Sequence, residues 1–488
     1  MEVGNVDAVT TKAIGFAQTV EKLSAICTAA YALLGPITGL IVWLLPLGVD
    51  ATVQKAFAIV AFMVIYWIME PVDHAVTALI GCYLFWSLGV AKFSLAFSGF
   101  ASTTPWFIYG AILMGEAASR TGLAKRIGYM VILKIGTSYS RLVFGIAVLS
   151  FLLNFLVPSG MARLALMAPM VIGLVDVFGL GQKSNVAKGL FIVLTASCSL
   201  LELMIMSGAA SILTRGIIEE QTGIQVLWSQ WFIAFLPASL ISVFVCWVVI
   251  LWLYPGERLE LPGGKRHLQD AVQQMGLWTL SEKKVFVWML LALTLWGTDF
   301  AHPIRPDIVA LGIGLLMALP RIGVLDTKAI KQVNFLPIIF SAGALSMGNV
   351  LLQARALDVS ANSAVEWIEP VLSNSFRAAV TLYWGGFLYH FVLPNRQSML
   401  ITSLPLLLRL AIAHGCNPVA IGLVWTFTGG ATLFAYQSAI LVMGYSYGYF
   451  DAKDLLKVGA VLTIVEGILL MFLVTLYWPL IGLSWAAQ

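Results

Sequence analysis

Long apolar segments recur along the whole chain, separated by short polar stretches. Segments of about 17–25 apolar residues are long enough to cross about 30 Å of hydrocarbon as helices. Lipid offers the backbone no hydrogen bonds, so such segments must be helical, and the alternation typical of a membrane barrel is not visible. The pattern predicts an all-α polytopic membrane protein with about eleven transmembrane helices. The predicted spans are 25–47, 55–69, 74–90, 105–119, 186–220, 231–253, 285–301, 306–320, 331–353, 417–447 and 456–482.

Two further apolar runs, 141–180 and 376–413, do not read as simple spans. Each is interrupted near its middle by a proline with small or polar neighbours, in the segments 157–160 (VPSG) and 393–396 (LPNR). Such an interruption removes backbone hydrogen bonds, which a membrane tolerates where the backbone is buried in protein or lines a cavity. We predict two re-entrant hairpins whose tips meet within the membrane, with kinked spanning helices as the alternative.

A broken helix follows each predicted hairpin. The segment 186–220 is interrupted at Ser207, and the segment 417–447 is interrupted at Gln437 and Ser438. Hairpin and broken helix therefore recur in the same order and at similar spacing in both halves of the chain. This arrangement indicates an inverted-repeat transporter.

Composition agrees with a membrane protein, because 60% of the 488 residues are hydrophobic and only 11% are charged. The polar stretch over 254–284 is rich in lysine and arginine, so we place it in the cytoplasm. The segment 1–24 lacks the basic start and apolar core of a signal peptide, and its helical periodicity predicts an interfacial helix. No nucleic-acid partner is expected.

Four motifs occur in the order found in a known family of transporters. They are YWIMEP at 66–71 with VTAL at 76–79, TGLAKR at 121–126, VPSGMAR at 157–163 with Pro169 beyond it, and YQS at 436–438 with GYF at 448–450 and DLLK at 454–457. In these motifs the chain resembles the divalent anion/sodium symporter (DASS) family of dicarboxylate, citrate and sulfate transporters. The resemblance implies an elevator-type transporter, in which a transport domain moves against a dimerising scaffold. It also implies horizontal helices near 121–138 and 354–371 that link the two parts.

The resemblance and the repeat together suggest a division of the chain. The transport domain would hold both hairpins and both broken helices. The expected parts are an interfacial helix (1–24), a first scaffold part (25–138), a first transport half (139–253), a cytoplasmic loop (254–284), a second scaffold part (285–371) and a second transport half (372–488).

Two arginines near the predicted tips, Arg163 and Arg396, point to an anionic substrate. An ionised side chain within a membrane is costly and commonly functional. Arginine offers paired donors to carboxylate or sulfate, and helix N-termini at the tips would also favour an anion. The alternative is that each arginine snorkels or pairs with a carboxylate such as Glu202.

Polar side chains at the interruptions complete the candidate site. They can bind the substrate or satisfy the broken backbone. The candidate substrate-binding residues are Ser159, Gly160, Arg163, Ser207, Asn395, Arg396, Gln437 and Ser438. Glu202 and His390 are candidates for coupling transport to protons, with a structural hydrogen bond as the alternative. Asp299 and His302 border a loop, and we expect them to be solvated.

The sodium sites that the family resemblance implies are degenerate here. Sodium prefers oxygen ligands, and Met161 stands in the first tip where the family carries an oxygen-bearing side chain. We therefore assign no metal ligand, expect degenerate sodium sites near Ser159 and Asn395, and expect no cofactor, with sodium left open. An empty carrier with uncompensated arginines would cross the bilayer less readily than a loaded one, which favours exchange.

The sequence thus predicts a secondary active transporter of small anions, foremost di- and tricarboxylates. We expect a homodimer integral to the cell (inner or plasma) membrane that works by an elevator mechanism, as an exchanger. One alternative is a sodium- or proton-coupled symporter of sulfate or another oxyanion or sulfonate. Others are an anion channel or an intramembrane enzyme, although no catalytic motif is visible and we expect no enzyme.

Overall fold

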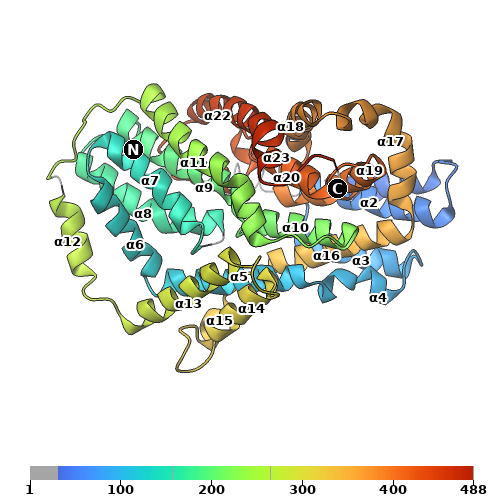
Figure 1. Cartoon of the computed structure of the whole chain (residues 1–488), viewed down its shortest axis with the longest axis horizontal. Helices are drawn as coiled ribbons and strands as arrows, with labels where there is room; N and C mark the ends of the chain where they lie inside the picture. The colour runs from blue at the N-terminus through green and yellow to red at the C-terminus, as the bar shows by residue number, and fades with distance from the viewer. Residues whose placement is uncertain (1–30, 158, 264, 487–488) are drawn as a thin grey trace, which may run out of the picture.

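The computed structural model describes residues 31–157, 159–263 and 265–486, and the backbone alone at 267 and 362–367. The expected interfacial helix over 1–24 and the proline at position 158 lie outside the described residues. The described chain is built of helices (Figure 1). Among its residues, six helical stretches are long and apolar enough to cross a membrane, and shorter apolar helices accompany them. The chain is a multi-pass membrane protein.

The first half of the chain supplies helices α2 to α11. They are α2 (Ala51–Met69), α3 (His74–Ser87), α4 (Phe93–Ala96), α5 (Thr103–Arg120), α6 (Leu123–Ile135), α7 (Tyr139–Leu153), α8 (Gly160–Phe178), α9 (Asn185–Met204), α10 (Ala209–Thr222) and α11 (Trp228–Leu253). A further apolar helix, Tyr31–Leu44, precedes them. The polar loop over 254–284 contains the short helix α12 (Arg266–Gln274).

The second half supplies helices α13 to α22 in the same order of long and short elements. They are α13 (Leu280–Gly297), α14 (Pro306–Leu316), α15 (Thr327–Lys331), α16 (Leu336–Gln353), α17 (Ala356–Leu372), α18 (Ser375–Val392), α19 (Arg396–Ala413), α20 (Pro418–Thr428), α21 (Ala439–Ser446) and α22 (Ala452–Phe472). A π-helical turn (Leu473–Tyr477) joins α22 to α23 (Trp478–Leu480). The two halves therefore repeat one arrangement of elements.

Local sequence explains why matching helices begin where they do. In the first half, α7, α8 and α9 start after Ser138, Ser159 and Ser184, and each serine side chain accepts a hydrogen bond from an amide of the first turn. In the second half, α18, α19 and α20 start after asparagines that cap them in the same way. These are favoured N-cap residues because they satisfy amides that the helix leaves free.

Helices are joined by turns where both hairpins were predicted, and both helix breaks are present. In the first, α7 and α8 meet at residues 154–159, and in the second, α18 and α19 meet at residues 393–395. Pro169 and Pro405 each lie within the second arm. The first broken helix is interrupted over 205–208, between α9 and α10, and the second over 429–438, between α20 and α21.

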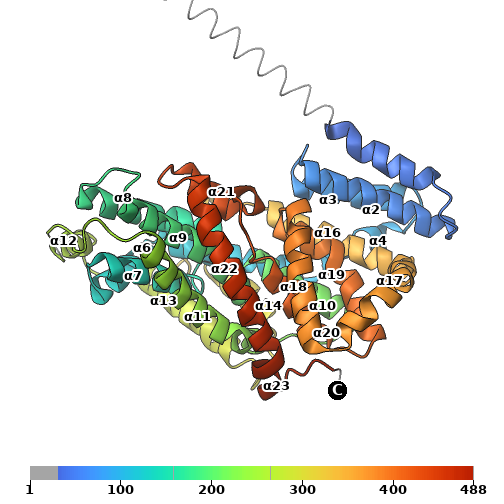
Figure 2. The same ribbon diagram turned by 90° about the horizontal axis from the view of Figure 1, so that it is seen from above.

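The two halves are interlocked around their broken helices. The arms α7 and α8 pack against α9, and the arms α18 and α19 pack against α20. Beyond each break the chain crosses over, so that α10 packs against α19 and α20, whereas α21 packs against α8 and α9. Figure 1 shows α10 leading from α9 toward α19, and Figure 2 shows α21 beside α9. Gly160 permits this crossing, because a Cβ there would lie 2.3 Å from Ile440 Cδ1.

The helices expected to form the scaffold pack closely on one another. Helix α5 runs along α14, and α16 lies against α3 and α5. At the crossing of α5 and α14 a Cβ on Gly314 would lie 2.9 Å from Gly110 Cα, so the two backbones touch. Small residues of this kind let membrane helices approach closely. Helices α6 and α17 occupy the positions at which the family resemblance implies linking helices.

One expectation from the sequence is wrong. Asp299 is buried rather than solvated, because its carboxylate caps the first turn of α11. Trp228 N donates to it at 2.7 Å, and the Ser229 hydroxyl also donates to it. His302 is half-buried, and its Nε2 lies 3.0 Å from Leu295 O.

Candidate functional site

Both hairpin tips and both helix breaks line one cavity of about 420 Å³. From the predicted site, the residues in its wall are Ser159, Glu202, Ser207, Asn395, Arg396, Gln437 and Ser438. The opposite wall comes from α5 and from residues 332–337 at the start of α16. The tips therefore meet, as the sequence predicts, at the boundary between the expected transport and scaffold parts.

The helix N-termini of both tips and both breaks reach this cavity, opposite the start of α16. Helices α8 and α19 begin at the two tips, and helices α10 and α21 begin at the two breaks. The N-termini of α10 and α21 carry no side-chain cap among the described residues, and Ala209 and Ala439 lie in the cavity wall. Free amides and the positive end of the helix dipole favour an anion. The arrangement thus suits a ligand with more than one negative charge.

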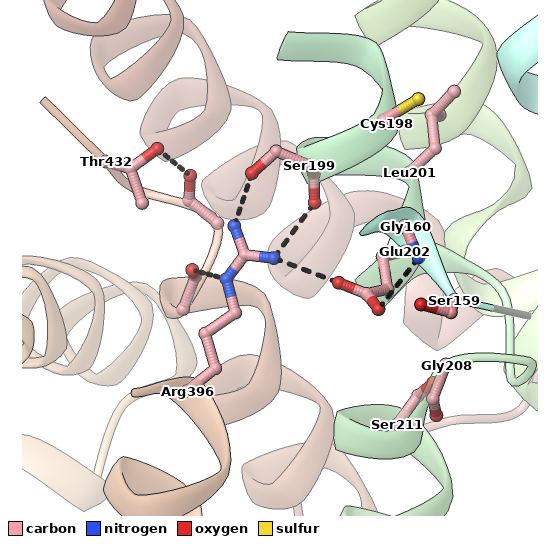
Figure 3. Close-up of polar contacts among 12 residues, drawn as sticks. Ser159, Gly160, Cys198, Ser199, Leu201, Glu202, Gly208, Ser211, Arg396 and Thr432 are labelled. Carbon is pink, nitrogen blue, oxygen red and sulfur yellow. Dashed lines mark hydrogen bonds and ion pairs between the residues drawn. The ribbon is translucent and has the colours of Figure 1, made fainter. Parts of the chain in front are cut away.

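Arg396, the first residue of α19, is 8% exposed and has its guanidinium directed toward α9 and α20. Its Nε donates to Gly429 O, at the C-terminal end of α20, over 2.7 Å. Its Nη1 and Nη2 donate to Ser199 O at 3.1 Å and Ser199 Oγ at 2.6 Å. The side chain joins the second tip to both broken helices, as Figure 3 shows.

Glu202 connects the two tips. Its Oε2 lies 3.4 Å from Arg396 Nη1 on the second tip, and its Oε1 accepts a hydrogen bond of 3.3 Å from Gly160 N on the first. Figure 3 shows the carboxylate between these two groups. Gly208 leaves room for this side chain, because a Cβ there would lie 2.6 Å from Glu202 Cγ.

Arg163 is fully buried and lies behind the first tip, outside the cavity wall. Its guanidinium donates to Val157 O at 2.9 Å, to Cys198 O at 3.0 Å and to the side chain of Asn154. Asn154 in turn donates to Leu201 O at 2.6 Å and accepts from Ser207 Oγ at 3.0 Å. Arg163 therefore fastens the hairpin to α9, and in this conformation it makes no contact with the cavity.

Gln437 carries a donor that has no partner among the described residues. Its Oε1 accepts hydrogen bonds from Leu433 N at 2.7 Å and Phe434 N at 2.9 Å, while its buried Nε2 has none. Two backbone donors on the oxygen fix the orientation of the amide, so the NH₂ group cannot exchange places with it. A buried donor left unpaired is costly, and because Gln437 lies in the cavity wall, its amide is a candidate to bind a ligand oxygen.

A second cavity, of about 340 Å³, lies elsewhere and does not suit an anion. Its wall is formed by residues of 224–233, 417–423 and 481–483, with no charged side chain among them. The cavity at the tips is the better candidate because charge, helix termini and an unpaired donor coincide there.

Comparison with known proteins agrees with this geometry. Residues 28–484 match the family described as the sodium:sulfate symporter transmembrane region. The chain belongs to this family. It is 25% identical to the citrate/succinate antiporter of Escherichia coli strain K12, over 80% of this chain and 81% of that protein. It is 23% identical to the L-tartrate/succinate antiporter of Escherichia coli strain UTI89, over 90% and 95% of the two chains.

A solved structure shares the fold of this sodium:sulfate symporter family member. The YdaH transporter of Alcanivorax borkumensis superposes with a TM-score of 0.56, covering 80% of this chain and 88% of its own. The two are 14% identical in sequence.

His390, the second coupling candidate, lies outside the cavity wall. It is buried near the end of α18, and its Nε2 lies 2.9 Å from the backbone oxygen of Pro394. The contact closes the turn that leads into Asn395. The structural hydrogen bond, the alternative weighed from the sequence, is the contact observed.

Several polar residues of the cavity wall were not predicted. They are Glu116, Gln332, Asn334 and Gln397. Glu116 pairs with Arg120 one turn further along α5, and Arg120 also donates to the side chain of Gln332. Glu116 could have been predicted from the sequence, because it lies inside the predicted span 105–119 and ionisable residues within spans are rare and commonly functional.

Proposed function

We propose that this protein exchanges di- and tricarboxylates across a cell membrane. The observation that carries the proposal is that the helix N-termini of both tips and both breaks converge on one cavity. Two such termini at the tips and two at the breaks can receive two carboxylates at once. The cavity of about 420 Å³ lies within the range of small-molecule sites, whereas a single sulfate would leave much of it to water.

The named relatives support the same substrate class and mode. Both are antiporters of carboxylates by name, and the chain matches each over most of its length. The argument for exchange from an uncompensated positive charge does not hold at Arg396, because Glu202 pairs with it. Exchange therefore rests on the relatives, and sodium dependence is decided by experiment.

We also propose that transport proceeds by an elevator movement in a homodimer. The cavity lies between the hairpin elements and α5 and α16, where a moving part would slide against a fixed one. Polar contacts cross this boundary and would break on movement, among them Arg215 Nη2 to Asp307 Oδ1 at 3.4 Å. Light scattering of the purified protein in detergent would test the dimer.

Uptake into proteoliposomes tests the function. Vesicles loaded with succinate and empty vesicles are compared, each in sodium, potassium or choline salts, with labelled succinate, citrate or sulfate outside. The proposal expects carboxylate uptake that requires internal carboxylate and is indifferent to the cation. Uptake that follows an inward sodium gradient, with empty vesicles as active as loaded ones, would instead establish a symporter. Preference for sulfate would overturn the substrate class.

A further inference from the structure

The carboxylate of Glu202 occupies a position that suits a substrate carboxylate. It lies between the backbone amide of Gly160, at the start of α8, and the guanidinium of Arg396. Each tip thus supplies one of these two donors. The side chain lines the cavity and is 17% exposed, so a ligand can reach it (Figure 3).

The other contacts of Arg396 leave Glu202 as its charged partner in the cavity. Three donated hydrogen bonds of the guanidinium go to Gly429 O, Ser199 O and Ser199 Oγ, which are uncharged. Glu202 supplies the negative charge at 3.4 Å. A substrate carboxylate that pairs with Arg396 from the cavity therefore approaches the place that Glu202 holds.

Its own helix does not hold Glu202 there. Glu202 lies two positions before Met204, the last residue of α9, and the C-terminal end of a helix is unfavourable for a negative charge. Among the described residues, the carboxylate is held by its contacts with the two tips. A ligand that offers the same two donors a better partner will release it.

We propose that Glu202 is an internal occupant of the substrate's carboxylate position. In the empty carrier it neutralises Arg396 and bridges the tips, and a substrate carboxylate binds by displacing it. This inference rests on the proposed function, and it makes Glu202 a residue that sets affinity by competing with the substrate.

Replacement of the charge should strengthen substrate binding. Glu202→Gln keeps the size and the hydrogen bond to Gly160 but removes the ion pair, so a substrate carboxylate meets a weaker competitor. We expect about tenfold tighter binding of succinate, as charge-assisted hydrogen bonds are roughly twice as strong as neutral ones. Gly208→Ala is an independent variant, because its Cβ would push Glu202 Cγ from its place while the charge stays. It too should tighten binding.

Asp358→Asn is the matched control. Asp358 pairs with Arg409 at 2.6 Å, but it lies outside the cavity wall. The same loss of a paired negative charge there should change succinate affinity less than about threefold. Equal tightening by both substitutions would show a general field effect and overturn the proposal.

Calorimetric titration of the purified, folded proteins with succinate, citrate and sulfate provides the test. Tighter binding in Glu202→Gln and Gly208→Ala, with Asp358→Asn unchanged, supports the proposal. If Glu202→Gln binds these anions with the same affinity as the wild type, or more weakly, the proposal is overturned and the proposed function stands. Binding of none of the anions by any of the four proteins overturns both. If the protein prefers sulfate and Glu202→Gln binds sulfate more tightly, the role proposed for Glu202 stands and the carboxylate substrate is overturned.

Discussion

Arg163 and Arg396, one from each hairpin, bind consecutive carbonyl groups of a single helix. Arg163 Nη2 lies 3.0 Å from Cys198 O, and Arg396 Nη1 lies 3.1 Å from Ser199 O, both on α9. Carbonyls toward the C-terminal end of a helix carry partial negative charge, which guanidinium groups stabilise. One turn of α9 therefore fixes the position of both tips relative to each other.

Replacing Arg163 should destabilise the protein more than it weakens binding to the protein that remains folded. Arg163→Met leaves the buried oxygens of Asn154, Val157 and Cys198 without this donor. Asn154 keeps its hydrogen bond from Ser207, but Val157 O and Cys198 O each lose a charged donor. Hydrogen bonds to charged groups contribute about 1.5–3 kcal/mol each, so we expect a loss of at least about 3 kcal/mol. Thermal unfolding in detergent measures it. Arg141→Met, an exposed arginine on the same hairpin, is the control, and an equal effect of both substitutions would contradict the assignment.

Lysine in place of Arg396 should preserve only part of the affinity for an anion. The planar guanidinium serves Gly429, Ser199 and Glu202 at the same time, whereas an ammonium is a compact point charge with fewer donors. We expect Arg396→Ala to weaken anion binding by about tenfold to over a hundredfold, and Arg396→Lys by a smaller factor. Both variants should also unfold at lower temperature, since the side chain joins α19 to α9 and α20. Titration and thermal unfolding of the same samples separate the two effects, and wild-type affinity in Arg396→Ala would show that its role is structural alone.

The unpaired amide of Gln437 offers the most selective test of the cavity. Gln437→Glu keeps an oxygen acceptor for Leu433 N and Phe434 N but replaces the free NH₂ group with a second acceptor. Loss of a hydrogen bond to a charged ligand amounts to about 1.5–3 kcal/mol, so binding should weaken by about tenfold to over a hundredfold. Because Gln437 is fully buried, the added charge should also lower the melting temperature, so affinity is measured on the protein that remains folded.

Gln332→Glu is the control for charge in that experiment. It adds the same charge to the same cavity wall, but next to Arg120 and without removing an unpaired donor. Equal weakening by both substitutions would mean that added charge, rather than the lost donor, explains the result.

Glu257 gives the protein a pH-dependent contact outside the membrane-spanning helices. Its carboxylate accepts hydrogen bonds from Asn185 N at 2.6 Å and Val186 N at 3.0 Å, at the start of α9. Burial acts to raise the pKa of Glu257, but these hydrogen bonds outweigh it, and the pKa is lowered. A lowered pKa means that the stabilisation is present above the usual pKa of about 4.3 and is lost as the pH falls through the folded-state value.

The melting temperature of Glu257→Gln should therefore lie below that of the wild type near neutral pH, and the two should converge below about pH 4. The effect is modest, about 1 kcal/mol or less, because the group is largely exposed. Glu260→Gln, an exposed neighbour in the same loop, should show no difference at either pH. A difference between Glu257→Gln and wild type that persists unchanged in acid would exclude this explanation.

The sequence was sufficient to predict where the backbone breaks and which polar residues gather there. Proline, glycine and serine inside apolar runs are visible without any knowledge of packing, and the tips and breaks fall at these residues. The serine and asparagine caps at matching helices were not predicted, although the structure shows that they recur in both halves. Local chemistry thus carries this part of the fold.

The directions of side chains were not predictable in the same way. Arg163 points away from the cavity because Asn154 and Cys198 lie behind the tip, and that arrangement depends on how α9 packs between the arms of the hairpin. Asp299 was misjudged for the same reason, since the start of α11 that it caps is distant in sequence. Glu202 appeared as one candidate among others, and only the meeting of the two tips shows that it bridges them.

The close approach of Gly160 to Ile440 has a consequence for how the protein is made. The first hairpin leaves the ribosome long before α21, yet its tip packs against that helix. Until the last helices are inserted, the tip and its polar groups lack their native neighbour on that side. The surface of the first half that packs against α21 therefore stays uncovered in the membrane until α21 is made. A chain truncated before α21 should therefore insert into the membrane without reaching the native fold. The quality-control machinery of the membrane would recognise its first half as incompletely folded.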